Sequence, residues 1–108
     1  MGTIRVQTVT IASSGTVSTA ARNRFGAQVG ILLPGALTGT SITFQVASEL
    51  DGTYTALKDA AGSNVSATVA ASTAFSLPAS VAAWPYFKIV SGSTESGART
   101  ITVVTKDD

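Results

Sequence analysis

The sequence predicts an all-β fold, a single β-sandwich of about eight or nine short antiparallel strands. Apolar residues alternate with Thr, Ser and Gln, which is typical of half-buried strands, instead of recurring every three or four positions as in helices. Turn-forming Gly, Pro, Asp and Ser residues separate these runs at the spacing of a sandwich. The 108 residues suffice for one core, so we expect one domain over residues 1–108.

The first strand is expected within "IRVQTVTIA", residues 4–12. Ile4 and Val6 have one parity, whereas Val9 and Ile11 have the other. Successive strand side chains point to opposite faces, so this change predicts a β-bulge or a change of sheet near Gln7. Residues 1–12 are therefore expected to form an edge strand or an N-terminal arm.

The clearest alternation lies in "TSITFQVAS", where Ile42, Phe44 and Val46 share one face and the polar residues between them share the other. We expect a central strand there. The jelly-roll and immunoglobulin topologies both remain open at this stage. Short helical turns are predicted at residues 18–25 and at 78–85, the latter between Pro78 and Pro85. Further strands are expected near Val17 and at residues 28–33, 53–57, 65–69, 74–77, 86–91 and 99–106.

The chain contains neither cysteine nor histidine. The lack of cysteine excludes disulfides, thiolate metal sites and cysteine nucleophiles. The lack of histidine removes the commonest metal ligand and the side chain best suited to proton transfer near neutral pH. We therefore predict that the protein is not an enzyme and needs no cofactor or metal.

Seven Lys and Arg residues against six Asp and Glu residues give a net charge of +1 without a basic stripe, so no nucleic-acid binding is expected. Residues 60–87 form the longest uncharged stretch, but Pro78 and Pro85 interrupt it, and we expect no membrane span. The N-terminus lacks the pattern of a secretory signal, which favours synthesis in the cytoplasm. A domain of this size is often stabilised by self-association.

Three acidic residues, Glu49, Asp51 and Asp59, occur within "ASELDGTYTALKDAAG". A close pair of carboxylates is the arrangement of glycosidases, and oxygen ligands can hold calcium. However, the spacing lacks the dense ligands of a calcium loop. Asp51-Gly52 is a hairpin signal, and Asp59 to Gly62 reads as a turn closed by glycine. We interpret the three acids as turn residues.

The aromatic residues Trp84, Tyr86 and Phe87 lie close together. Stacked rings could bind sugars or bases. Because Phe87 alternates with Ile89, we instead expect at least one ring in the core, with Trp84 capping the sandwich end. Isolated arginines such as Arg99 are usually solvated surface groups.

The order "ITFQVASELDGTYTALKDAAGSNVSATVAASTAFSLP" followed by "WPYFKIVSGSTESGARTITVV", from Ile42 to Val104, resembles a group of small virion proteins of tailed bacteriophages. The shared features are a "DGTY" hairpin, a "D-x-x-G" turn, a "V-A-A-S" segment, "YFKIVSG" and a final strand near "ARTI". The resemblance implies a capsid decoration or cement protein on the capsid surface, bound to the major capsid protein or other virion proteins. The alternatives are a tail or head-fibre component, or a carbohydrate-binding module of a phage adhesin that uses Tyr54, Trp84 or Tyr86.

Residues 1–40 match this group less well. In decoration proteins such a segment often supplies an arm to neighbouring subunits, which implies partner contacts at Arg5, Arg22 and Arg24. The resemblance also implies a homo-oligomer, with a trimer at threefold positions of the shell. This group of virion proteins has no active site whose residues could be matched to positions of this sequence.

Overall fold

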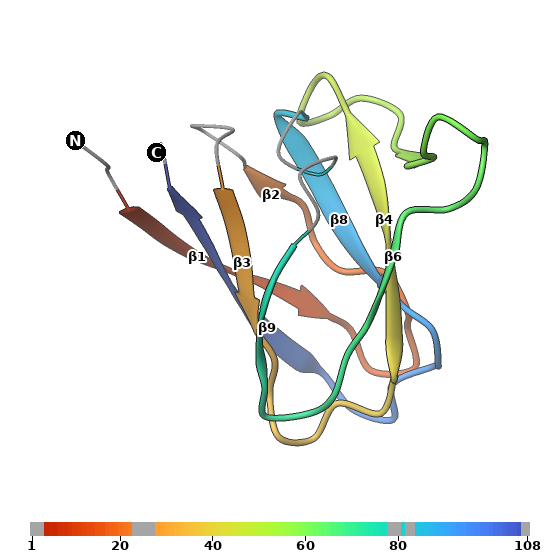
Figure 1. The fold of residues 1–108 in the computed structure, drawn as a ribbon. Coiled ribbons are helices and arrows are strands. Elements are labelled where there is room, and N and C mark those ends of the chain that lie inside the picture. The colour runs from red at the N-terminus through yellow and green to blue at the C-terminus, as the bar shows by residue number, and fades with distance from the viewer. Residues whose placement is uncertain (1–3, 23–27, 78–80, 82–83, 107–108) are drawn as a thin grey trace.

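A computed structural model describes residues 4–22, 28–77, 81 and 84–106, which form two antiparallel sheets facing each other (Figure 1). The first sheet has the order β1-β9-β3-β7. Its strands are β1 (Ile4–Ile11), β9 (Arg99–Lys106), β3 (Gln28–Leu32) and β7 (Ala74–Ser76). The second has the order β2-β8-β4-β5, and β6 pairs with the same β4. Its strands are β2 (Ala21–Arg22), β8 (Tyr86–Ser91), β4 (Ser41–Ala47), β5 (Thr55–Ala56) and β6 (Ser66–Thr68). The predicted all-β sandwich is confirmed.

The strand order is that of a jelly roll. β1 pairs with β9, β2 with β8, β3 with β7 and β4 with β5 and β6, so the first half of the chain pairs with the second half in reverse order. Such a long antiparallel ribbon, rolled so that β9 also meets β3 and β8 also meets β4, gives the two sheets of a jelly roll. An immunoglobulin fold keeps its first two strands in one sheet, whereas β1 and β2 lie in different sheets here.

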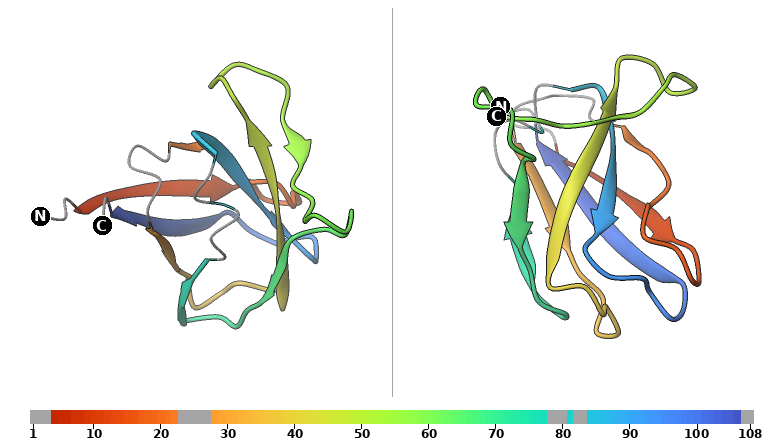
Figure 2. Two further views of the ribbon diagram at one scale, coloured as in Figure 1. Left: turned by 45° about the horizontal axis from the view of Figure 1, so that its top comes forward. Right: turned by 90° about the vertical axis from the view of Figure 1, so that its right-hand side faces the viewer.

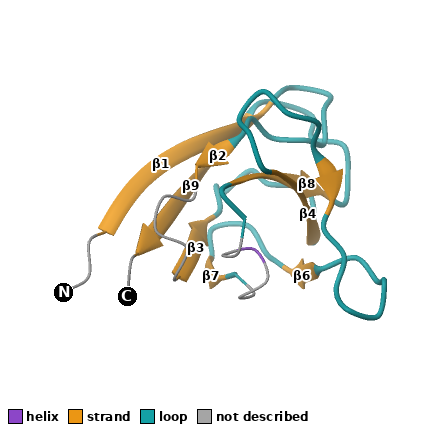
Figure 3. Cartoon of the chain, turned by 90° about the horizontal axis from the view of Figure 1, so that it is seen from above, coloured by secondary structure: helices purple, strands orange, loops and turns teal. Residues whose placement is uncertain are grey.

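The core fills the space between the two sheets. Figure 3 shows the two sheets and this space from above. The alternation in β4 places Ile42, Phe44 and Val46 inside, as the sequence predicts. Both sheets contribute fully buried side chains, among them Val9, Ile11, Ile31, Phe44, Phe87, Ile89, Ile101 and Val103. Because inner and outer residues alternate along every long strand, the outer faces of the two sheets are exposed and available for contact with other molecules.

The predicted bulge or change of sheet near Gln7 is wrong. The pairing of β1 with β9 runs without interruption from Ile4 opposite Lys106 to Ile11 opposite Arg99. Val9 and Ile11 face the core, while Ile4 and Val6 face outward and are 62% and 67% exposed. The change of parity therefore marks a strand that is apolar on its inner face at one end and on its outer face at the other.

The predicted helical turn at residues 18–25 is also wrong in its described part, because Ala21–Arg22 forms β2. The side-chain amide of Gln7 replaces a strand partner there: Nε2 donates to the Arg22 carbonyl at 2.6 Å, and Oε1 accepts from the Arg22 amide at 3.0 Å. Of the segment 78–85, only Val81, Trp84 and Pro85 are described, and the Trp84 amide donates to the Val81 carbonyl at 3.2 Å.

Most predicted strands are present with small changes of length. β8 and β9 have the predicted bounds, whereas the strands expected at 53–57 and 65–69 shorten to β5 and β6. Val17 forms an isolated bridge to Val90. The two views in Figure 2 show the long connections of the second sheet projecting from one end of the sandwich. In the described part of the chain, no helix is long and apolar enough to cross a bilayer.

Candidate interaction surface

The outer face of the second sheet carries two tyrosines and two cations, Tyr54, Tyr86, Arg22 and Lys88, which we call the tyrosine face. Strand alternation explains its β8 members: Phe87 and Ile89 are fully buried, so Tyr86 and Lys88 point outward. Arg22 lies opposite Tyr86 in the β2–β8 register, and its Cζ is 5.9 Å from the centre of the tyrosine ring. This is the distance range of a cation–π contact.

Lys88 makes the second cation–π contact of this surface. Its Nζ lies 4.4 Å from the centre of the Tyr54 ring. The Tyr54 hydroxyl donates to the Leu50 carbonyl at 3.0 Å, which ties the ring to the turn between β4 and β5. Burial and the negative charge of Asp51, with a further effect of Tyr86, raise the pKa of Tyr54 above its ordinary value. Tyr54 therefore stays a neutral hydroxyl over the physiological range.

Tyrosine and arginine are enriched at protein interfaces, because each combines a large contact area with directional hydrogen bonds. On the tyrosine face one side of each ring is occupied by a cation, so less ring surface is left for stacking on a sugar. Its two cationic side chains suit a protein surface rich in carboxylate and carbonyl oxygens.

The three arginines predicted to contact partners fall in three different places. Arg22 belongs to the tyrosine face. Arg5 is exposed on β1 of the other sheet, two positions from Gln7, which binds the Arg22 backbone. Arg24 lies outside the described residues. The role of all three in partner contacts stays a prediction.

Asp59 is a turn residue, as its sequence context predicts. Its Oδ1 accepts hydrogen bonds from the amides of Ala61 and Ser63 at 2.9 and 3.0 Å, and Gly62 adopts a φ of 84°. The Gly52 amide donates to the Glu49 carbonyl at 3.0 Å, which closes the turn that contains Asp51. In the described part of the chain, no group of three or more acidic side chains is placed to hold a metal ion.

The aromatic residues divide as the alternation predicts. Phe87 is fully buried in the core, whereas Trp84 is 38% exposed just before β8. Trp84 is therefore an exposed ring beside the strand that supplies half of the tyrosine face.

Glu95, an acidic residue that the sequence analysis did not single out, is fully buried. Its Oε1 accepts from the Thr38 amide at 2.8 Å and from Arg99 Nε at 3.0 Å. Its Oε2 accepts from the Gly39 amide at 3.0 Å and from the Ser91 hydroxyl at 2.9 Å. Arg99 is thus an ion-pair partner, 13% exposed, and not the solvated surface group that its sequence context predicts.

The Glu95 backbone extends this network to a third loop. Its carbonyl accepts from the Ser14 amide at 2.8 Å, and its amide donates to the Gly15 carbonyl at 3.0 Å. Glu95 therefore joins the β1–β2, β3–β4 and β8–β9 connections at the lower end of the sandwich in Figure 1. The only sequence signal was its place in a Gly- and Ser-rich loop four residues before Arg99.

Burial opposes ionisation of Glu95, but the hydrogen bonds from Thr38, Ser91, Gly39 and Arg99 outweigh it and lower the pKa of this carboxyl below its ordinary value. Both carboxylate oxygens are occupied by protein donors. An anion without a free lone-pair direction or solvent access is suited to holding loops together, and we assign Glu95 a structural role.

No protein-family model and no curated protein matches the sequence. Among solved structures, the SPBc2 prophage-derived protein YomS matches with a TM-score of 0.64 over 98% of this chain and 95% of YomS, at 14% identity. The chain shares its fold with YomS. The Yersinia pseudotuberculosis-derived mitogen (TM-score 0.38, 13% identity, 96% of this chain and 85% of that one) is less similar. A Bacillus endospore appendage protein (TM-score 0.33, 16% identity, 97% and 89%) is also less similar, and both likenesses are too slight for an argument.

Proposed function

We propose that this chain is a structural protein of a bacteriophage particle, and that it acts as a capsid decoration or cement protein bound to the major capsid protein. The observation that carries the proposal is the tyrosine face, a sheet surface with interface-type residues held in place by cation–π contacts. It requires no catalysis and no cofactor.

Two further observations support a role in the virion. The jelly roll is a fold of viral capsid and lectin domains, which is an analogy at the level of fold. YomS, which shares this fold, is a prophage-derived protein. Both agree with the resemblance of Ile42 to Val104 to small phage virion proteins.

The mechanism is added interface. Each bound copy buries surface on capsid subunits, and its binding free energy favours the intact lattice over a loosened one. A rigid sandwich suits this role, because little conformational entropy is lost on binding. The Glu95 network contributes to this rigidity by joining three loops.

Co-sedimentation with capsids that lack this protein tests the proposal. We expect saturable binding at a fixed copy number per lattice position, together with better resistance of the shell to heat. Arg22→Ala removes a cation of the tyrosine face and should weaken binding by at least about tenfold. Lys58→Ala is the matched control, because Lys58 is exposed and binds Asn64 in the β5–β6 connection instead.

Absence of binding to heads would overturn the decoration role. Equal weakening by Arg22→Ala and Lys58→Ala would show that net charge, and not the tyrosine face, drives attachment. If the protein binds tails and not heads, it is a tail or head-fibre component.

The exposure of Trp84 favours one second candidate, a carbohydrate-binding module of an adhesin. A sugar stacked on this ring would change its fluorescence, and Trp84 is the only tryptophan in the chain. A glycan array, followed by fluorescence titration of any hit, separates this role from capsid binding.

A further inference from the structure

The outer face of the first sheet carries exposed apolar side chains that are not part of the core. Ile4, Val6 and Leu32 point away from the core and are 62%, 67% and 51% exposed. The strand register sets Val6, Val104, Gly30 and Ser76 in one row across all four strands. We call this surface the apolar face: Ile4, Val6, Gly30, Leu32, Ala74 and Val104.

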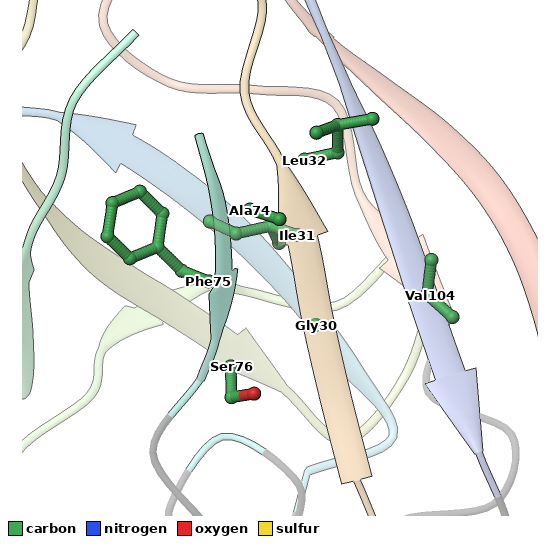
Figure 4. Close-up of a pocket in the computed structure, with 7 residues that line it drawn as sticks. All are labelled: Gly30, Ile31, Leu32, Ala74, Phe75, Ser76 and Val104. Atoms are coloured by element: carbon green, nitrogen blue, oxygen red, sulfur yellow. The ribbon is translucent and has the colours of Figure 1, made fainter. Parts of the chain in front are cut away.

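A hollow of about 280 Å³ lies at the centre of this face, above Gly30 (Figure 4). It is bordered by Leu32, Ala74, Ser76 and Val104. A Cβ added at Gly30 would meet only the Phe75 carbonyl oxygen, at the ordinary contact distance of 3.4 Å. Glycine inside a strand costs about 0.5–1 kcal/mol relative to alanine. Intramolecular packing therefore does not explain why this position lacks a side chain.

The charges on the two outer faces differ. The side chains described on the outer face of the first sheet are uncharged, including the threonines at positions 8, 10, 100 and 102. The strand register places one charged residue at an outward position, Lys106, opposite Ile4 at the end of the sheet. Two identical faces bring like groups together, so a charged face repels its own copy. A twofold axis that runs across the strands places the two copies of Lys106 at opposite ends of a contact through the apolar face. On the tyrosine face, Arg22 and Lys88 lie over the rings, so like charges oppose contact between two copies.

The area is that of a weak, reversible contact. The four strands contain 8, 8, 5 and 3 residues, and with strands about 4.8 Å apart and a rise of about 3.3 Å per residue they cover roughly 380 Å². Two copies in contact would bury about 760 Å² in total, which is the size of a weak and transient interface. The face also contains both protruding side chains and a hollow, as a self-complementary twofold contact requires.

We propose that a second copy of this chain docks on the apolar face, and that the two first sheets pack against each other across a twofold axis. Protruding apolar side chains of one copy, such as Val6 or Leu32, enter the hollow above Gly30 of the other. This contact is independent of capsid binding by the tyrosine face. It is also a different state from the trimer that the resemblance implies.

The mass in solution, measured by light scattering and analytical ultracentrifugation, tests this contact. We expect the mass of the wild type to rise toward twice the 10.9 kDa of one chain as its concentration approaches about 1 mM. Gly30→Lys and Val6→Lys each place a charge in the contact and should raise the dissociation constant by at least about 100-fold. Thr68→Lys, at an exposed strand position of the other sheet, adds the same charge and should leave the dimer intact.

The two lysine variants distinguish loss of contact from loss of fold. Their circular dichroism spectra should match that of the wild type, because both positions tolerate an outward-pointing side chain. A wild-type monomer at about 1 mM, where even a weak contact should form, would overturn the proposal. So would a trimer, or a dimer that persists in both lysine variants. Capsid binding that survives in a monomeric Gly30→Lys variant would leave the proposed function standing by itself.

Discussion

Among single residues, Glu95 is the one whose replacement we expect to harm the fold most. Glu95→Gln keeps the shape of the side chain but removes the charge that Arg99, Thr38, Gly39 and Ser91 stabilise. It leaves Arg99 largely buried without an anion, so the free energy of unfolding should fall by about 3 kcal/mol. Urea unfolding followed by circular dichroism measures the change. Glu49→Gln, at an exposed turn, should change it by less than about 0.5 kcal/mol.

The same carboxyl predicts how stability depends on pH. Its pKa is lower in the folded chain than its ordinary value of 4.5, so folding favours the ionised form. The contribution is fully present above about pH 4.5 and is lost as the pH falls through the folded-state pKa. The difference in unfolding free energy between wild type and Glu95→Gln should therefore shrink between pH 6 and pH 3. A difference that stays constant would show that the charge is not what stabilises the loops.

Thr105 is a position where a substitution should raise the stability of the fold. It is fully buried, and in the described part of the chain its Oγ1 has no hydrogen-bond partner. Thr105→Val replaces the hydroxyl with a methyl group and should raise the free energy of unfolding by about 1 kcal/mol. The control is Thr100→Val in the same strand, where the side chain is exposed. A loss of stability in Thr105→Val would indicate that the hydroxyl binds a buried water.

Among the structural elements, the loop between β3 and β4 depends on a glycine. An added Cβ at Gly39 would overlap the Ser91 hydroxyl, which itself donates to Glu95. Gly39→Ala should therefore push the loop away and lower the free energy of unfolding by about 1–3 kcal/mol. Gly30→Ala is the matched control, since its Cβ meets only ordinary contacts and should be neutral or slightly stabilising. Thermal unfolding of both variants decides between these outcomes.

β1 and β2 show what local pattern can and cannot predict for an element. The change of parity between Val6 and Val9 is real, but the prediction of a bulge assumed that every apolar residue in a strand faces the core. In β1 the outward apolar residues form part of a surface. β2 lay in a segment rich in alanine, and its strand state depends on β8 and on the Gln7 side chain, which the local sequence does not contain.

For the whole molecule, self-association should appear as stability that depends on protein concentration. A dimer unfolds at a higher temperature when more protein is present, because association favours the folded state. Between about 20 μM and 2 mM, the wild-type unfolding midpoint should rise by a few degrees. The unfolding midpoint of the Gly30→Lys variant should not depend on protein concentration. Equal behaviour of the two proteins would contradict a contact through the apolar face.

The sequence by itself determined the class of fold, the faces of β4 and β8, the burial of Phe87 and the turn at Asp59. These features follow from side-chain period and turn chemistry, which act between residues a few positions apart. The tertiary structure alone decided the jelly-roll order, the pairing of Glu95 with Arg99, and the meeting of Arg22 with Tyr86. It also decided that Ile4 and Val6 face outward. Each of these depends on which distant strand lies alongside, and hydrophobic burial is non-directional, so a local pattern specifies that a residue is apolar but not which surface covers it.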